Sequence, residues 1–150
     1  MPKSNDFNEI VGLDLKVLSN GEGYILWCVD LFTKMVKGTF IRDKQPMTII
    51  KAIISSWIVG DGSGPGHPSR GFYSDNGAEF LNNDLIDFAS KYNLSISMTA
   101  ANAPWQNGIV ERNHATADII IEKLLKEDPS LSKQEAINQA CLAKNSEVNK

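Results

Sequence analysis

The order of the apolar segments constrains the fold of this chain more than any other feature of its sequence. Segments 10–18, 24–29 and 35–41 are rich in β-branched and aromatic residues, and only turn sequences lie between them. The chain therefore opens with three strands joined as hairpins. Shorter strands at 71–74 and 94–98 then alternate with segments that have helical spacing. The predicted order, βββαβαβαα, indicates an α/β fold with one mixed sheet and helices on both faces.

Helices are predicted where apolar residues recur at helical spacing between residues that begin or end helices. Pro46 suits the first position of a helix, and Gly60 suits its end. Ser132 and Glu135 form a capping box that begins the last helix. The other helices are predicted at about 83–92 and 106–127, and the last one runs toward residue 147.

The composition indicates one domain, because 150 residues, 42% of them hydrophobic, can bury one sizeable core. No apolar run approaches the roughly 20 residues of a membrane helix, and the first residues lack the pattern of a signal peptide. Cys28 and Cys141 fall in apolar segments, which indicates buried free thiols. We therefore expect an intracellular protein with no membrane partner. Because the first strand begins close to the first residue, we also expect residues 1–150 to be a domain taken from a longer protein.

The charge of the chain is unusual for a nucleic-acid-binding domain. The formal net charge is −3 at pH 7, and the isoelectric point is about 5.3. Proteins that bind nucleic acids gain affinity by neutralising phosphates, which requires a positive surface. Either the partner is not a nucleic acid, or basic segments lie outside this chain.

Three acidic residues stand where a strand, a strand end and the start of a helix are expected. They are Asp14, Asp75 and Glu111, and 35 residues separate the last two. A charge in an apolar strand is costly to bury unless a cation compensates it, and open sheets bind ligands at strand ends. Three converging carboxylates can hold two divalent cations, about 3.5–4 Å apart, for chemistry on phosphodiesters. The three residues are therefore candidate metal ligands.

Each acid also has an ordinary structural explanation. Asp14 could face solvent from an edge strand, and Asp75 precedes Asn-Gly, which is a turn sequence. Glu111 lies near a helix N-terminus, where the helix dipole favours acids. Glu79, four residues after Asp75, is a weaker candidate ligand. Taken singly, none of the acids distinguishes a metal site from plain structure.

Four segments around these acids resemble the catalytic core of retroviral and retrotransposon integrases, a branch of the DDE transposase superfamily. They match in sequence, in order and in the 35-residue spacing, and the resemblance covers about residues 9–127. The segments are 11–14 (Val-Gly-Leu-Asp), 24–34 (Tyr-Ile-Leu-Trp-Cys-Val-Asp-Leu-Phe-Thr-Lys), 74–80 (Ser-Asp-Asn-Gly-Ala-Glu-Phe) and 104–114 (Pro-Trp-Gln-Asn-Gly-Ile-Val-Glu-Arg-Asn-His).

The resemblance implies an RNase H-like fold, a five-stranded sheet with strand order 3-2-1-4-5. It also implies Mg²⁺ or Mn²⁺ as cofactor, with two ions held by Asp14, Asp75 and Glu111 in the active complex. In the family's reaction, water cleaves near the 3′ end of element DNA, and the freed 3′-hydroxyl then attacks target DNA. The implied partners are DNA and further copies of the chain, as a homodimer or larger oligomer. The implied location is the nucleus or a retroelement particle.

Other matched positions have smaller expected roles in binding substrate. By resemblance, Asn107 and Gly108 form a mobile loop beside the site, and Trp105 in that loop stacks on DNA or caps the core. His114, one turn after Glu111, contacts substrate or supports the site, and we expect it on the surface. Asp30 and Thr33, by contrast, are expected to organise the turn after the second strand.

Two positions depart from the family pattern. Many relatives carry Lys or Arg four or seven residues after the glutamate, and this chain has Ala115 and Asp118 at those positions. An acid at position 118 would repel phosphate or weakly attract a metal ion. Two alternatives therefore stand beside an integrase core. One is a domesticated integrase-like module that binds DNA or protein without catalysis, and the other is a nuclease with an RNase H fold.

Overall fold

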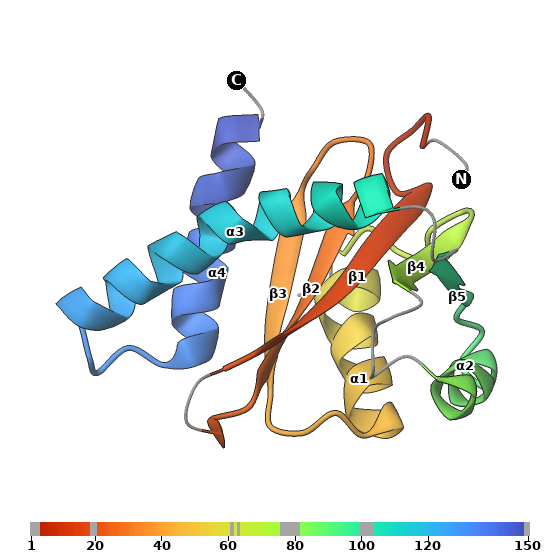
Figure 1. Cartoon of the computed structure of the whole chain (residues 1–150), viewed down its shortest axis with the longest axis horizontal. Coiled ribbons are helices and arrows are strands. Elements are labelled where there is room, and N and C mark those ends of the chain that lie inside the picture. Colours follow the sequence, from red (N-terminus) through yellow and green to blue (C-terminus); the bar gives the residue numbers. More distant parts are fainter. Residues whose placement is uncertain are drawn as a thin grey trace.

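The computed structural model describes residues 4–18, 21–60, 62, 64–75, 82–99 and 104–148. Within its helices and strands, the side chains at 75, 98–99, 104–111, 113 and 147–148 lie outside that description. A five-stranded sheet forms the centre of the structure, in the order β3-β2-β1-β4-β5 that was predicted (Figure 1). Its strands are β1 (Ile10–Val17), β2 (Tyr24–Asp30), β3 (Val36–Ile41), β4 (Gly71–Asp75) and β5 (Ile96–Thr99).

The sheet is mixed because its two halves are built differently. β1, β2 and β3 pair antiparallel as consecutive hairpins, whereas β4 pairs parallel with both β1 and β5. Parallel neighbours need crossover connections, and helices on the faces of the sheet supply them. As a result, β1 is hydrogen-bonded along both of its edges.

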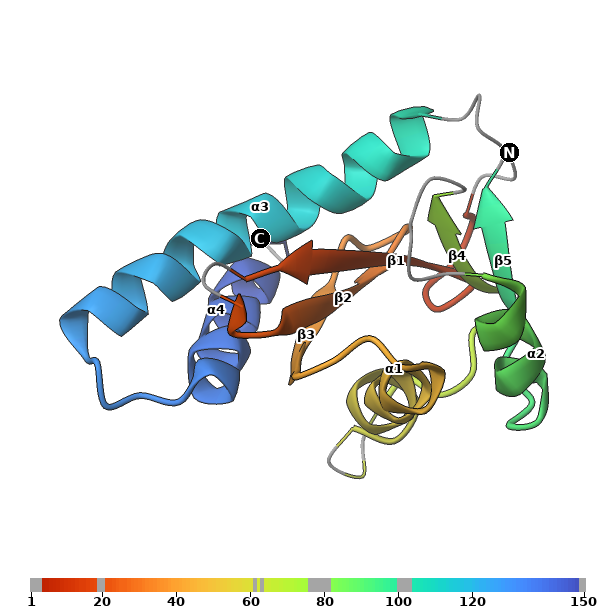
Figure 2. The ribbon, with the colours of Figure 1, turned by 60° about the horizontal axis from the view of Figure 1, so that its bottom comes forward.

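Helices cover both faces of the sheet, as predicted (Figure 2). α1 (Pro46–Ile53), its continuation η2 (Ile54–Val59) and α2 (Asn83–Ser90) lie on one face. α3 (Pro104–Glu127) and α4 (Lys133–Val148) lie on the other. None of the helices in the described residues is long and apolar enough to cross a membrane.

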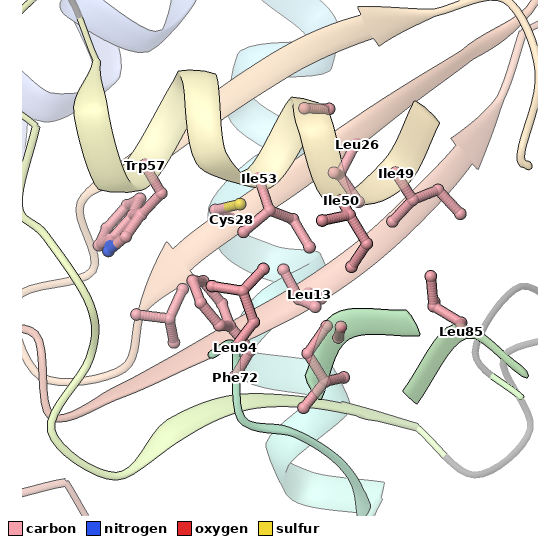
Figure 3. Close-up of a cluster of buried hydrophobic side chains, with 14 of the residues drawn as sticks. Leu13, Leu26, Cys28, Ile49, Ile50, Ile53, Trp57, Phe72, Leu85 and Leu94 are labelled. Atoms are coloured by element: carbon pink, nitrogen blue, oxygen red, sulfur yellow. The ribbon is translucent and has the colours of Figure 1, made fainter. Parts of the chain in front are cut away.

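The side chains of the strands alternate between two hydrophobic cores, one on each face of the sheet. Leu13 of β1 and Leu26 of β2 belong to the core beneath α1 and α2, where they lie near Ile53 (Figure 3). Ile10 and Trp27, on the same two strands, belong instead to the core beneath α3 and α4. The side chains of β1 face these two apolar cores in turn. A charged side chain on this strand therefore needs a partner at most positions.

The two cysteines lie on opposite faces of the sheet, Cys28 in the first core and Cys141 in the second. Both are buried and free, as predicted. Burial raises the pKa of each thiol to about 12, so both are protonated at neutral pH.

Two helices differ from their sequence prediction. The helix predicted from Pro46 to Gly60 has the right extent, but from Ile54 it is wound as a π-helix, whose hydrogen bonds span one residue more. The long helix predicted to begin at residue 106 begins at Pro104. Proline fits there because the first turn of a helix leaves its N–H groups without intrahelical partners.

Asn8 joins four segments that are far apart in the sequence. Its backbone has a left-handed φ of 58°, and its N–H donates to Asp30 Oδ1 at 2.9 Å. Its Nδ2 donates to the carbonyl oxygens of Pro65 and Gly66, at 3.0 and 3.2 Å. Its Oδ1 accepts a 2.8 Å hydrogen bond from Nε1 of Trp57, in η2. These bonds fix the N-terminal segment to the turn after β2, to η2 and to the segment that follows η2.

Asp30 organises the turn between β2 and β3. It is fully buried, and its Oδ2 accepts hydrogen bonds from the backbone N–H and the hydroxyl of Thr33, both at 2.7 Å. With the bond from Asn8, three donors surround this carboxylate. The predicted role of Asp30 and Thr33 in the turn is confirmed.

We expect Asp30→Ala to lower the free energy of unfolding by about 3 kcal/mol, because it leaves buried donors of Asn8 and Thr33 without an acceptor. Urea denaturation followed by circular dichroism measures the loss. Asp87→Ala removes the same group from an exposed position on α2, and it should change stability by less than about 0.5 kcal/mol. Equal effects of the two substitutions would show that the hydrogen bonds of Asp30 contribute nothing.

Candidate active site

Asp14 lies on the central strand β1, on the face that α3 covers. Its side chain is 34% exposed. Its Oδ1 accepts a 2.9 Å hydrogen bond from the N–H of Leu15, and its Oδ2 lies 2.6 Å from Nε2 of His114. The explanation of Asp14 as a residue of an edge strand is wrong, since β1 lies between β2 and β4 in the sheet, and its pairing with β4 ends at Gly12.

His114 of α3 is packed against the sheet, with only 7% of its surface exposed. Its ring stacks on Trp27, the cross-strand neighbour of Asp14, with ring centroids 5.3 Å apart and planes 5° from parallel. Gly38 makes room for that indole, because a Cβ at this position would lie 2.7 Å from a carbon of the Trp27 ring. The surface position expected for His114 is therefore wrong.

The imidazole ring of His114 is held between two carboxylates. Its Nδ1 lies 3.1 Å from Oδ2 of Asp118, and its Nε2 contacts Asp14. Burial lowers the pKa of His114, but the hydrogen bonds to Asp118 and Asp14 outweigh it and raise the pKa from 6.5 to about 9. At neutral pH the ring is therefore a cation that donates an N–H to each carboxylate.

Asp118 has two cationic neighbours. Besides His114, Nζ of Lys16 lies 3.2 Å from Asp118 Oδ1, as an ion pair without hydrogen-bond geometry. The Asp118 side chain is only 15% exposed. The negative charge of Asp118, which was expected to repel phosphate, is thus compensated within the protein.

The backbone brings the positions of Asp75 and Glu111 near Asp14. β1 and β4 are paired in parallel as far as Gly12 and Tyr73, and each aspartate follows two residues later on its strand. Glu111 lies in α3, one turn before the histidine that contacts Asp14. The side chains of Asp75 and Glu111 lie outside the described residues, so their convergence on Asp14 stays a prediction.

The mobile loop predicted at Asn107 and Gly108 is wrong, because both residues, like Trp105, lie in the first turns of α3. A glycine within a helix costs only about 1 kcal/mol relative to alanine, too little to break a long helix. The side chains of Trp105 and Asn107 are outside the described part of the chain. Within the described part, no three His, Cys, Asp or Glu residues form a metal-binding group, and two of the three predicted ligands lack described side chains.

Sequence reasoning missed Lys16 and Trp27 as neighbours of the site. Part of the signal was present, because Lys16 follows Asp14 by two residues and so shares its strand face. Asp118 likewise follows His114 by four residues and shares its helix face. What the sequence did not show is how the strand and the helix are aligned with each other.

Solved structures of retroviral integrases share the fold of this chain. The HTLV-2 integrase catalytic core domain, in a dimeric form with magnesium, superposes with a TM-score of 0.64 at 22% identity, over 90% of this chain and 84% of that one. The BIV integrase core gives 0.67 at 15% identity, over 91% and 82%. This chain has the fold of a retroviral integrase catalytic core.

Other matches place the integrase-core fold within longer proteins. A chain of the simian T-cell lymphotropic virus intasome, in complex with PP2A regulatory subunit B56 gamma, has a TM-score of 0.69 at 18% identity. This match covers 89% of our chain and 47% of that one. The retrovirus-related Pol polyprotein from transposon 412 of Drosophila melanogaster is 28% identical over 109 residues, 73% of this chain and 8% of the polyprotein. No family model matches the sequence.

The ion pairs of His114 predict a loss of stability in mild alkali. The folded-state pKa of about 9 exceeds the ordinary value of 6.5, so the stabilisation is complete below the lower value and is lost as pH rises through the higher one. The free energy of unfolding should fall by up to about 1.4 kcal/mol per pH unit within this window. Urea titrations in buffers with EDTA measure it.

His114→Gln is the matched control, because it removes the titrating group and keeps a side-chain N–H donor. Subtracting its pH profile from that of the unsubstituted protein removes the contributions of all other groups. The difference should be largest below pH 6.5 and should decline to a value that no longer depends on pH above the raised pKa. Parallel profiles would mean that the carboxylates do not hold a proton on His114.

Proposed function

We propose that this chain is the catalytic core of a retroelement integrase, a metal-dependent polynucleotidyl transferase. It would cleave near the 3′ ends of element DNA and join those ends to target DNA. The observation that carries this proposal is the position of Asp14. It lies at the centre of an integrase-core sheet, next to the strand that ends in Asp75 and beneath the helix that contains Glu111.

The carboxylate of Asp14 fits a divalent cation such as Mg²⁺ or Mn²⁺. Both ions prefer oxygen ligands, and about a third of this side chain is exposed. Each of its oxygens takes part in one hydrogen bond, to Leu15 or to His114, and a carboxylate oxygen has two lone pairs. A lone pair on each oxygen is therefore left for a cation. We assign Asp14, Asp75 and Glu111 as the ligands of two ions.

The cations, when bound, would supply Lewis-acid activation of the phosphodiester and of the attacking hydroxyl, so that no protein nucleophile is needed. The HTLV-2 integrase core was solved in complex with magnesium, which supports a divalent cation for this fold. The work left to the chain's own residues is to orient the three carboxylates and to hold the DNA backbone in line with them.

Two basic residues lie close to the site although the chain has a net charge of −3. Arg112 is exposed on α3, directly after Glu111. Burial lowers the pKa of Lys34, in the turn after β2, and the charge of Arg112 is near enough to lower it further, against the opposite effect of Asp30. Two neighbouring cations can bind successive phosphates of a DNA strand. This local positive charge supports DNA as the partner.

The proposed assembly extends beyond this chain. We propose that residues 1–150 are one domain of a longer protein, since the matched polyprotein is covered only to 8%. The proposed partners are element DNA, target DNA and a second copy of the chain, as in the dimeric form of the HTLV-2 core. The reaction would take place in the nucleus or in a retroelement particle.

A second candidate is a domesticated integrase-like module that binds DNA or protein without catalysis. The net charge of −3 and the acid at Asp118 favour it, because both weaken the attraction of DNA. A nuclease with an RNase H fold is a third candidate, because the fold alone does not distinguish hydrolysis from joining.

We expect the chain to join short DNA duplexes in the presence of Mn²⁺, and we expect Asp75→Asn to abolish joining because it removes a charged ligand. Labelled duplexes separated by gel electrophoresis measure cleavage and joining independently. Asp87→Asn, the same change of acid to amide at an exposed position of α2, should leave both activities unchanged. Joining that survives Asp75→Asn would contradict the proposal, and cleavage without joining would favour the nuclease.

Calorimetric titration with Mn²⁺ tests the metal site without DNA. We expect binding that Asp14→Asn abolishes, since the amide is a neutral and weaker ligand for a hard cation. Asp87→Asn, on the exposed face of α2, is the control and should bind as the unsubstituted chain does. Equal binding by all three proteins would rule out Asp14 as a ligand.

A further inference from the structure

Four charged side chains connect β1 to α3, and we call Asp14, Lys16, His114 and Asp118 the charge array. Asp14 and Lys16 are two residues apart on the strand, which corresponds to a rise of about 6.6 Å. His114 and Asp118 are one turn apart on the helix, a rise of about 6 Å. Because the two spacings nearly match, Asp14 meets His114 at 2.6 Å while Lys16 meets Asp118 at 3.2 Å.

The imidazole ring at the centre of the charge array has no freedom to turn. Both ring nitrogens are engaged by carboxylates, and one face of the ring lies flat on Trp27. Rotation of the ring would break both of these contacts, and only 7% of the surface of His114 is exposed. The contact with Asp118 therefore fixes the direction in which Nε2 of His114 points.

The direction of Nε2 in turn fixes the carboxylate of Asp14. The N–H of Leu15 restrains Oδ1, and His114 restrains Oδ2, so the plane of the carboxylate is set from both sides. These two bonds leave one lone pair on each oxygen, and the side chain keeps its 34% exposure. Asp14 is thus held in one orientation without being blocked.

We propose that Asp118 and His114 are positioning residues for Asp14, and that they hold its carboxylate in the orientation that binds the divalent cation. This inference rests on the proposed function, because it assumes that Asp14 is a metal ligand. Groups that hydrogen-bond to metal ligands typically change metal affinity by about 10- to 100-fold when they are removed. No substrate contact is required of either residue.

The test is the affinity of the chain for Mn²⁺, measured by calorimetry in Asp118→Ala and Asp118→Asn. The alanine variant removes the acceptor for Nδ1 of His114, and it should weaken Mn²⁺ binding by about 10- to 100-fold. The asparagine variant loses the charge but keeps an oxygen acceptor for Nδ1, and it should recover much of the affinity. Glu122→Ala, an exposed acid one turn further along α3, controls for the loss of one negative charge and should have little effect.

Urea denaturation of each variant in EDTA separates positioning from stability. His114→Gln is the second variant, and it should lose affinity as Asp118→Ala does while remaining folded. Unchanged Mn²⁺ affinity in Asp118→Ala, or a loss equal to that of Glu122→Ala, would overturn the inference. Higher affinity in either variant would also overturn it, because it would show that His114 competes with the cation. If Asp14→Asn binds Mn²⁺ as well as the unsubstituted chain, the proposed metal site itself fails.

Discussion

The whole site depends on the pairing of β1 along both of its edges. Antiparallel pairing with β2 joins β1 to the opening hairpins, and parallel pairing with β4 places the strand that ends in Asp75 beside it. A strand in this position is covered on both faces, so a charge on it requires a partner from the protein. His114 is that partner for Asp14, and its position fixes where α3 crosses the sheet.

The sequence predicted the parts of the fold that depend on local patterns. The element order, the two-sided arrangement of helices and the capping of α4 by Ser132 follow from patterns within short segments, whereas the strand order came from the resemblance to integrase cores. The sequence predicts a surface position for His114 because its neighbours at helical spacing are polar. Local periodicity does not show that a strand of the sheet supplies the opposite charges that pair with this helix face. The loop at Asn107 and Gly108 was predicted from the resemblance, whereas these residues lie in α3, where the cost of one glycine is outweighed by the rest of the helix.

The net charge of the chain does not describe the charges around the candidate site. The charge array contains two acids and two bases, so it is neutral when His114 is protonated. Asp118, which departs from the basic residue found in many relatives, is matched by a base on the neighbouring strand. The exposed Arg112 and the adjacent Lys34 are outside this array. A net charge of −3 is therefore compatible with basic residues that lie near each other, as Arg112 and Lys34 do.

The contact between Asp14 and His114 also has a consequence for how the protein folds. The hairpins of β1, β2 and β3 span only residues 10–41, whereas this contact closes a separation of 100 residues. Local contacts form early and distant ones late. Until α3 docks on the hairpins, Asp14 and Lys16 are without their partners on a face that is otherwise largely apolar. Docking of α3 therefore has to replace the water around the Asp14 carboxylate with the imidazole ring of His114.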